Sequence, residues 1–125
     1  MIAGTDFVLA DFEQAWPLIR ERAGKWIEPH VVDGAARPGA SVCVVNTDGM
    51  LVFTLFAVDN RLRALVLLGV STGTPGAFWR QEAAMVAIAR DMGASWLAFE
   101  SARRGWAKVL GPHWRRNGDL YEREL

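Results

Sequence analysis

The stretch from Arg61 to Glu100 decides the fold, and it reads RLRALVLLGV, STGTPG, AFWRQEAAMVAIARDMG and ASWLAFE in succession. An apolar segment, a Gly/Thr/Pro loop, a helical segment and a second apolar segment follow one another. Two buried strands joined through one helix form a right-handed βαβ unit with parallel strands. We therefore expect parallel strands at residues 61–70 and 95–100, with a long helix between them.

The loop at residues 71–76 opens at the carboxyl end of the first of these strands and leads into a helix N-terminus. That is where α/β proteins most often hold an anionic ligand. A phosphate site here would use Val70, Ser71, Thr72, Gly73, Thr74 and Gly76. A purely structural turn would need only Thr74 as the helix cap and Pro75 at the first helical position, where a missing N–H costs nothing. Gly93 is expected to end the helix.

The residues before this unit predict a three-stranded antiparallel meander. Its strands are residues 40–46, 50–58 and 61–70, joined by the turns Thr47-Asp48-Gly49 and Asp59-Asn60. An Asp-Gly pair between apolar runs is a strong hairpin signal. Alternation along the third strand predicts one wholly apolar face, which suits a central strand. The residues of that face are Leu62, Ala64, Val66 and Leu68.

Helical and hairpin signals fill the two ends of the chain. Asp11 is the expected cap of a first helix, with Gln14 completing a capping box and Gly24 ending the helix. Residues 25–39 are poorly patterned and are predicted as loop. After Glu100 we expect a short helix at residues 103–111 and a closing hairpin, HWRR and DLYEREL, around Asn117-Gly118. The sequence thus predicts one α+β domain over residues 1–125.

The composition indicates the redox compartment of the protein and argues against some classes of partner. Hydrophobic residues make up 51% and charged residues 22% of the chain, an ordinary globular balance. Cys43, the only cysteine, stands in the apolar run SVCVV, so we expect a buried thiol in a reducing compartment. No segment is long and apolar enough to span a membrane, and the N-terminus does not read as a secretory signal. A net charge of zero argues against a general nucleic-acid binder.

The order of helix, three-stranded meander, helix, strand, short helix and hairpin resembles the GNAT fold, the N-acetyltransferase fold built around acetyl-CoA. The resemblance covers about residues 6–125, although no segment is predicted as the family's usual first strand. It implies a mixed sheet in which the antiparallel meander is followed by the βαβ unit and a C-terminal hairpin. It also implies that the loop at residues 71–76 corresponds to the family's pyrophosphate loop.

The functional motifs of that family are altered here. Its pyrophosphate signature is Arg/Gln-x-x-Gly-x-Gly/Ala, whereas this chain has VSTGTPGAFW, with its glycines three apart and a proline removing one N–H donor. The family's thiolate-protonating Tyr would fall at Ala107, beside Trp106, and neither residue offers an acid of useful pKa. The chain looks like the small GNAT-like proteins of tailed bacteriophages, some of which serve in the virion or in head assembly.

The resemblance therefore implies a non-catalytic protein that works through protein contacts, needs no cofactor, and resides in the host cytoplasm or the virion. Residues 101–125 carry six basic and three acidic side chains, and Trp and Arg are the residues that protein interfaces concentrate. The candidate interaction residues are Arg103, Arg104, Trp106, Lys108, Trp114, Arg115 and Arg116. On the structural alternative, each Trp packs under the sheet edge beneath its Arg neighbours. Trp16, Trp79 and Trp96 are expected in the core.

Two other hypotheses stay open. An acyl-CoA-dependent N-acetyltransferase would hold acetyl-CoA between the two parallel strands, with Glu100 at the end of the second strand as the base. A small nucleic-acid-binding protein would use the basic tail, but we do not expect this. Self-association through an exposed strand is compatible with every hypothesis. No spacing of His, Cys, Asp or Glu resembles a metal site.

Overall fold

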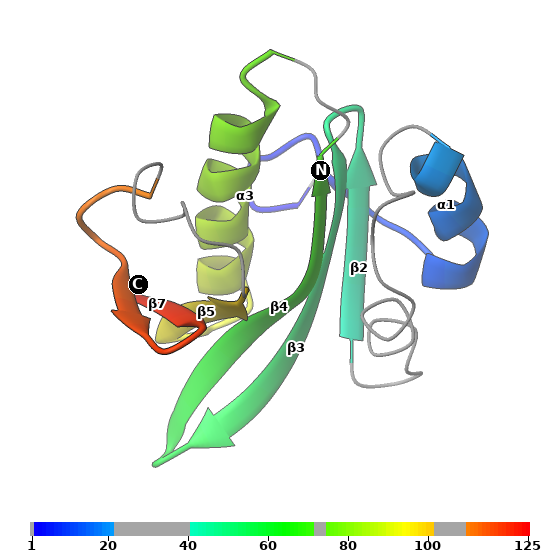
Figure 1. Ribbon diagram of the computed structural model, residues 1–125. Coiled ribbons are helices and arrows are strands. Elements are labelled where there is room, and N and C mark those ends of the chain that lie inside the picture. The colour runs from blue at the N-terminus through cyan, green and yellow to red at the C-terminus, as the bar shows by residue number, and fades with distance from the viewer. Residues whose placement is uncertain (1, 22–40, 72–74, 102–109) are drawn as a thin grey trace.

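The computed structural model describes residues 2–21, 41–71, 75–101 and 110–125, which form one mixed sheet flanked by two helices (Figure 1). The described strands make a seven-stranded sheet in the order β1-β2-β3-β4-β5-β7-β6. The elements are β1 (Val8–Leu9), α1 (Phe12–Ile19), β2 (Ser41–Asn46), β3 (Gly49–Val58), β4 (Arg61–Ser71), α3 (Ala77–Asp91), β5 (Trp96–Glu100), β6 (Arg115–Asn117) and β7 (Leu120–Glu124).

The predicted βαβ unit is confirmed. β4 and β5 pair in parallel, from Arg63 opposite Trp96 to Val66 opposite Phe99, and α3 connects them. Every other pair of neighbouring strands is antiparallel, including the predicted meander of β2, β3 and β4. The α+β class with a mixed sheet is therefore confirmed. The predicted short helix at residues 103–111 lies almost wholly outside the described residues.

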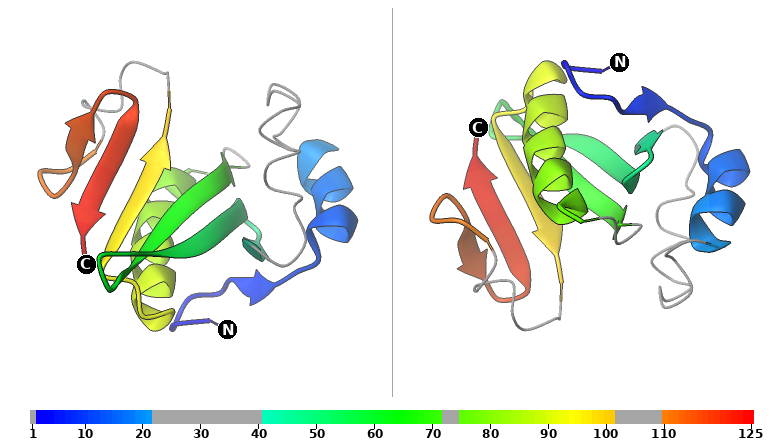
Figure 2. Two further views of the ribbon diagram at one scale, coloured as in Figure 1. Left: turned by 90° about the horizontal axis from the view of Figure 1, so that it is seen from below. Right: turned by 90° about the horizontal axis from the view of Figure 1, so that it is seen from above.

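Two apolar clusters pack the helices against the sheet, one on the side of α3 and one on the side of α1. The views in Figure 2 place α3 on one face of β4 and β5, whereas α1 lies beyond β2. The cluster on the α3 side includes Phe7, Val44, Leu51, Phe53, Ala64, Val66, Ala84, Val86, Ile88, Ala89, Ala94 and Leu97. The cluster on the α1 side includes Ile19, Cys43, Met50, Val52, Leu68 and Val70, with Phe12 and Trp16 packed against it. Cys43 is buried as predicted, and burial together with Asp11 raises the pKa of its thiol to about 11.

The prediction of one wholly apolar face on β4 is wrong. Val52 pairs with Leu68 but its neighbour Phe53 pairs with Val66, so Leu67 is an extra residue in β4. Such a bulge reverses the alternation of side chains beyond it. Ala64 and Val66 consequently lie in the cluster on the α3 side, whereas Leu68 and Val70 lie in the cluster on the α1 side. Both faces of β4 are thus apolar, each in one half of the strand.

Two other predicted boundaries are wrong by one or two residues, and one strand was not predicted. The closing hairpin turns at Gly118-Asp119 instead of Asn117-Gly118, because Asn117 pairs with Leu120 inside the sheet. The helix α3 begins at Ala77, so Thr74 and Pro75 precede it, and its N-cap is Gly76 with a φ of 76°. A first strand does exist, but β1 has only two residues, too few to show a period of two in the sequence.

Several local predictions are confirmed. The carboxylate of Asp11 caps α1 by accepting a hydrogen bond from the Glu13 N–H at 3.0 Å. Asp59 and Asn60 both have positive φ, the backbone of a tight two-residue hairpin turn. Gly93, with a φ of 84°, directly follows the C-cap of α3. The predicted end of α1 at Gly24 lies outside the described residues.

Gly49 is the most closely packed of the glycines that the structure describes. It has a φ of 148°, and a Cβ there would lie far inside contact distance of the Val70 carbonyl oxygen and 2.8 Å from Gln81 Nε2. We expect Gly49→Ala to lower the free energy of unfolding by about 3 kcal/mol or more, because clash and backbone strain add. Urea unfolding followed by Trp fluorescence measures the effect.

Gly118→Ala is the matched control for this substitution. Gly118 also has a positive φ, 63°, but a Cβ there would meet nothing within 4 Å. Only the backbone cost of about 1–2 kcal/mol then remains. Equal destabilisation by the two substitutions would show that the close approach at Gly49 does not exist.

Candidate functional site

The end of β4 and the start of α3 form the place where the sequence predicts an anion site. Val70 is buried, Ser71 is half-buried and Gly76 is exposed. The predicted site residues Thr72, Gly73 and Thr74 lie outside the described residues. Gly76, in the left-handed conformation, caps α3 without a side-chain hydrogen bond. The described part of the predicted anion site therefore consists of the backbone at Val70, Ser71 and Gly76 and of the side chains around it.

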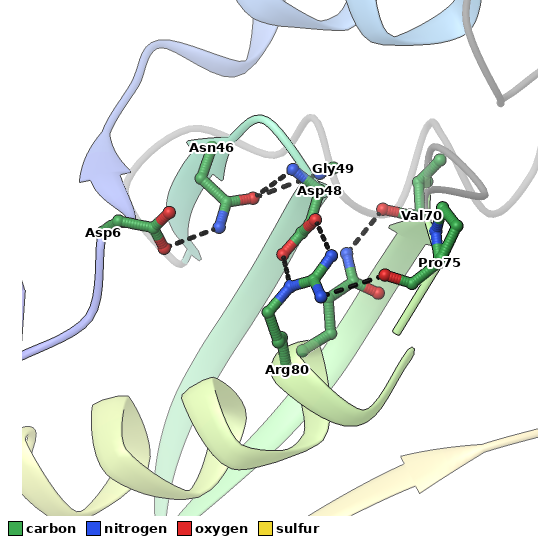
Figure 3. Close-up of polar contacts among 8 residues, drawn as sticks. Asp6, Asn46, Asp48, Gly49, Val70, Pro75 and Arg80 are labelled. Carbon is green, nitrogen blue, oxygen red and sulfur yellow. Dashed lines mark hydrogen bonds and ion pairs between the residues drawn. The ribbon is translucent and has the colours of Figure 1, made fainter. Parts of the chain in front are cut away.

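An ion pair between a buried aspartate and a half-exposed arginine lies beside the start of α3 (Figure 3). Arg80 donates from Nε and Nη2 to the two carboxylate oxygens of Asp48, each at 2.7 Å, and from Nη1 to the Pro75 carbonyl at 3.0 Å. The side chain of Asp48 is only 6% exposed, whereas that of Arg80 is 51% exposed. The hydrogen bonds from Arg80 lower the pKa of Asp48, and Asp48 raises the pKa of Arg80. Each charge is held in its ionised form by the other.

The turn that carries Asp48 is fixed by its own hydrogen bonds. Asn46 Oδ1 accepts from the Asp48 N–H at 2.9 Å and from the Gly49 N–H at 3.1 Å. Asn46 Nδ2 donates to Asp6 Oδ1 at 2.9 Å, which connects the turn to the N-terminal segment (Figure 3). These bonds fix the backbone of the turn from which the Asp48 side chain extends to Arg80.

Gln81 joins α3 to β4 next to this ion pair. Its Nε2 donates to the Val70 carbonyl at 2.7 Å, and the residue is 7% exposed. We call Asp48, Gly49, Val70, Arg80 and Gln81 together the α3 corner. Sequence reasoning missed Asp48, Arg80 and Gln81 as site residues, since Asp48 and Arg80 are 32 positions apart in the sequence and have no local spacing to recognise. The only signal was the Asp-Gly turn itself, which placed an acid at a strand end.

The parallel pairing of β4 with β5 covers only part of β4. Pairing between β4 and β5 ends at Val66 opposite Phe99, while β4 continues to Ser71. The bulge at Leu67 lies at the point of separation, and Gly69 beyond it is exposed. Glu100, the candidate base, is exposed at the end of β5, where it pairs with Leu120 of β7.

The structure describes three of the candidate interaction residues. Trp114 is half-buried: its Nε1 donates to Glu82 Oε1 at 3.1 Å and its ring meets Phe99 edge-on at 5.2 Å. Arg115 and Arg116 are exposed on β6. Trp114 therefore packs between the C-terminal hairpin and α3, while the two arginines face solvent. The other candidates, Arg103, Arg104, Trp106 and Lys108, lie outside the described residues.

The predicted core position of Trp79 is wrong. Its residue is 57% exposed on α3, because the apolar face of the helix that covers the sheet carries Ala84, Ile88 and Ala89 instead. Trp96 is half-buried on β5, and Trp16 packs on Phe12 with ring centroids 5.8 Å apart.

The Asp48–Arg80 pair makes stability depend on pH. The folded pKa of Asp48 lies below its unfolded value of about 3.9, so the contribution of its charge is complete above that value and is lost as pH falls through the folded pKa. We expect Asp48→Asn to lower the free energy of unfolding by about 1–2 kcal/mol at pH 7. The gap to the unmodified protein should close as pH falls from about 4 towards 2, measured by urea unfolding at each pH.

Asp59→Asn is the control, since Asp59 is an exposed aspartate in a comparable hairpin turn. Its substitution should change stability by less than about 0.5 kcal/mol at every pH. A pH-independent effect of Asp48→Asn would contradict a charged pair at the α3 corner.

Other features of the described residues bear on the class of protein. The residues that the structure describes contain no cluster of three or more His, Cys, Asp or Glu side chains able to hold a metal ion. Within the same residues, no helix is long and apolar enough to cross a membrane. Comparison of the chain with known protein families, with curated proteins and with solved structures gave no match.

Proposed function

We propose that this chain is a GNAT-like protein that works through contacts with other proteins and not through acyl transfer. Its support is the order of described elements: α1, the meander of β2, β3 and β4, then α3, β5 and the hairpin of β6 and β7. This is the order on which the resemblance rests. A role in a phage virion or in head assembly is part of the proposal and comes from that resemblance alone.

The observation that carries the proposal is the ion pair of the α3 corner. In the family that the chain resembles, the N-terminus of the corresponding helix meets the pyrophosphate of the cofactor. Here Arg80, the cation of the first turn of α3, is already bound in two places by the buried Asp48 carboxylate. A phosphate approaching Arg80 would meet the like charge of the Asp48 carboxylate, which Arg80 binds through both of its oxygens. On this proposal, the charges of Asp48 and Arg80 stabilise the fold.

Exposed residues at two places supply surfaces for protein contact. Arg115 and Arg116 lie on β6, the edge strand of the described sheet, and edge strands offer unpaired backbone groups to another chain. Trp79 stands exposed on α3. Trp and Arg are enriched at interfaces because they bury a large area and make several contacts each. Either surface would serve a second copy of the chain as well as a different protein.

The second candidate function, an acyl-CoA-dependent N-acetyltransferase, is favoured by the separation of β4 and β5. Beyond Val66 the strand β4 is not paired with β5, so an extended cofactor arm would lie along this edge of β4. Position 69 of β4, an exposed glycine, carries no side chain, and Glu100 at the end of β5 would act as the base. Val70, Ser71 and Gly76 would then hold the phosphates together with the loop residues.

Titration with acetyl-CoA and CoA separates the two functions. We expect no change in melting temperature at 1 mM of either compound, since Asp48 already neutralises the cation at the start of α3. A ligand at one hundred times its dissociation constant would add about 2.7 kcal/mol, which amounts to several degrees in a domain of this size. Differential scanning fluorimetry followed by calorimetry makes the measurement.

ATP at the same concentration is the control for unspecific anion effects, because it shares the adenine and the phosphates. A shift with acetyl-CoA that ATP does not produce would reject the proposed function in favour of the acyltransferase. In that case Gly69→Leu should weaken the shift, since its side chain would lie over Leu51 and Val66 beside the unpaired part of β4.

A further inference from the structure

The turn between β6 and β7 begins with an asparagine that is followed by a glycine, Asn117-Gly118. Asn117 is exposed, and within the described part of the chain its side-chain amide makes no hydrogen bond. Gly118 is also exposed, has a φ of 63°, and would meet nothing within 4 Å if it carried a Cβ. The space around Gly118 therefore leaves room for a side chain to approach its backbone nitrogen.

The other two asparagines of the chain have different surroundings. Asn46 Oδ1 accepts two backbone hydrogen bonds and its Nδ2 donates a third, so its amide is fixed in place. Asn46 is followed by the β-branched Thr47, and Asn60 is followed by Arg61. A side chain on the following residue hinders the approach to its backbone nitrogen, whereas glycine permits it. Asn117 is thus the asparagine that is placed best to react with the backbone that follows it.

A positive charge lies beside the same turn. Arg116 Nε donates to the Gly118 carbonyl at 2.8 Å, which keeps the guanidinium next to the turn. A cation so close favours loss of the proton from the Gly118 N–H, because it stabilises the anion that forms. The exposed Asp119 carboxylate acts in the opposite direction, but in the described part of the chain no hydrogen bond of its own keeps it there.

We propose that Asn117 is a site of spontaneous deamidation and that Arg116 promotes the reaction. The deprotonated Gly118 nitrogen attacks the side-chain carbonyl carbon of Asn117 and forms a new C–N bond. The bond from that carbon to the side-chain nitrogen breaks, and this nitrogen leaves as ammonia with the proton that Gly118 lost. Water then opens the resulting succinimide at either carbonyl, which leaves an aspartate or an isoaspartate at position 117.

The reaction requires Asn117 to rotate out of the strand, since an extended backbone keeps the Gly118 nitrogen away from the side-chain carbonyl. Asn117 pairs with Leu120 in the last of the three residue pairs that join β6 to β7. β6 is the outermost described strand at its end of the sheet, and all of its residues are exposed (Figure 2). A pair at the end of a short edge strand opens at a small cost in free energy. Asn117 can therefore react while the rest of the sheet remains folded.

Both products alter β6, which is one of the two surfaces proposed for protein contact. An aspartate at position 117 adds a negative charge beside Arg116. An isoaspartate also adds one carbon to the main chain before Gly118, which disrupts the pairing with Leu120. The modification site stands without the proposed function, and only its consequence for protein contacts rests on that function.

Incubation of the full chain at mildly alkaline pH for several weeks tests the inference. Peptide mapping by mass spectrometry locates each deamidated residue, and enzymatic methylation of the side-chain carboxylate measures isoaspartate. We expect Asn117 to deamidate in the folded chain, with isoaspartate among the products, while Asn46 and Asn60 stay intact. The urea-unfolded chain is the positive control for the chemistry. If Asn117 stays intact in the folded chain while it deamidates in urea, or if Asn46 reacts as fast, the inference is overturned.

Two substitutions separate the effect of Arg116 from that of the Asn-Gly pair alone. Arg116→Gln should slow deamidation about fivefold, the effect of one unit charge about 4 Å away in bulk water. Arg115→Gln is the matched control, since Arg115 is an exposed arginine of the same strand for which no hydrogen bond to the turn is found among the described residues. It should leave the rate unchanged within twofold. Equal slowing by the two substitutions would overturn the role of Arg116.

Gly118→Ala provides an independent check, because it places a side chain on the attacking residue. It also destabilises the turn, which by itself would favour opening and faster deamidation. We expect the reaction to be at least tenfold slower, and an unchanged or faster reaction would contradict attack by the Gly118 nitrogen. Acetyl-CoA binding would reject the proposed function and leave this site in place, whereas an intact Asn117 rejects this inference alone.

Discussion

The close approach of three chain segments at Gly49 is the constraint on which the rest of the structure depends. At this residue the start of β3, the end of β4 and the first turn of α3 lie too close for any side chain. The Asp48–Arg80 ion pair and the Gln81–Val70 hydrogen bond fasten the same three segments. Because α3 is anchored at its start, its apolar face is aligned over β3, β4 and β5. The sheet and its covering helix are thus fixed relative to each other from one corner.

The periodic parts of the chain were predictable from the sequence. Apolar runs bounded by Asp-Gly and Asp-Asn gave the meander, because turns of two residues leave little freedom in strand register. The βαβ unit followed from one long helical segment between two apolar strands. Asp11 and Gly93 marked helix ends through capping chemistry that depends only on neighbouring residues.

Other features depend on contacts between distant residues, and no local pattern contains them. The bulge at Leu67 breaks an alternation that looks perfect in the sequence, because both faces of β4 are covered by apolar clusters. The helix α3 begins at Ala77 and not at the predicted Pro75, because Pro75 and Gly76 form a turn. Arg80 donates a hydrogen bond to the Pro75 carbonyl of this turn. The partnership of Asp48 with Arg80, and that of Arg63 with Trp96, became visible only once the strands were paired.

The two arginine-containing sites differ in how their charges are balanced. At the α3 corner one arginine meets one buried carboxylate in two short hydrogen bonds, so the charge is satisfied within the chain. At the other end of β4, Arg61 lies over the ring of Trp96, and Arg63 makes only a long contact with Glu122, at 3.5 Å. A charge satisfied internally, as at the α3 corner, stabilises the fold.

The proposed function depends on the pairing of the Asp48 carboxylate with the Arg80 guanidinium, the cation that a bound phosphate would otherwise contact. Calorimetric titration of inorganic pyrophosphate into the unmodified chain and into Asp48→Asn tests it most directly, because the substitution frees Arg80 at the start of α3. The account predicts that the unmodified chain binds pyrophosphate at least tenfold more weakly than the variant. Binding by the unmodified chain that is as tight as, or tighter than, binding by Asp48→Asn would contradict it.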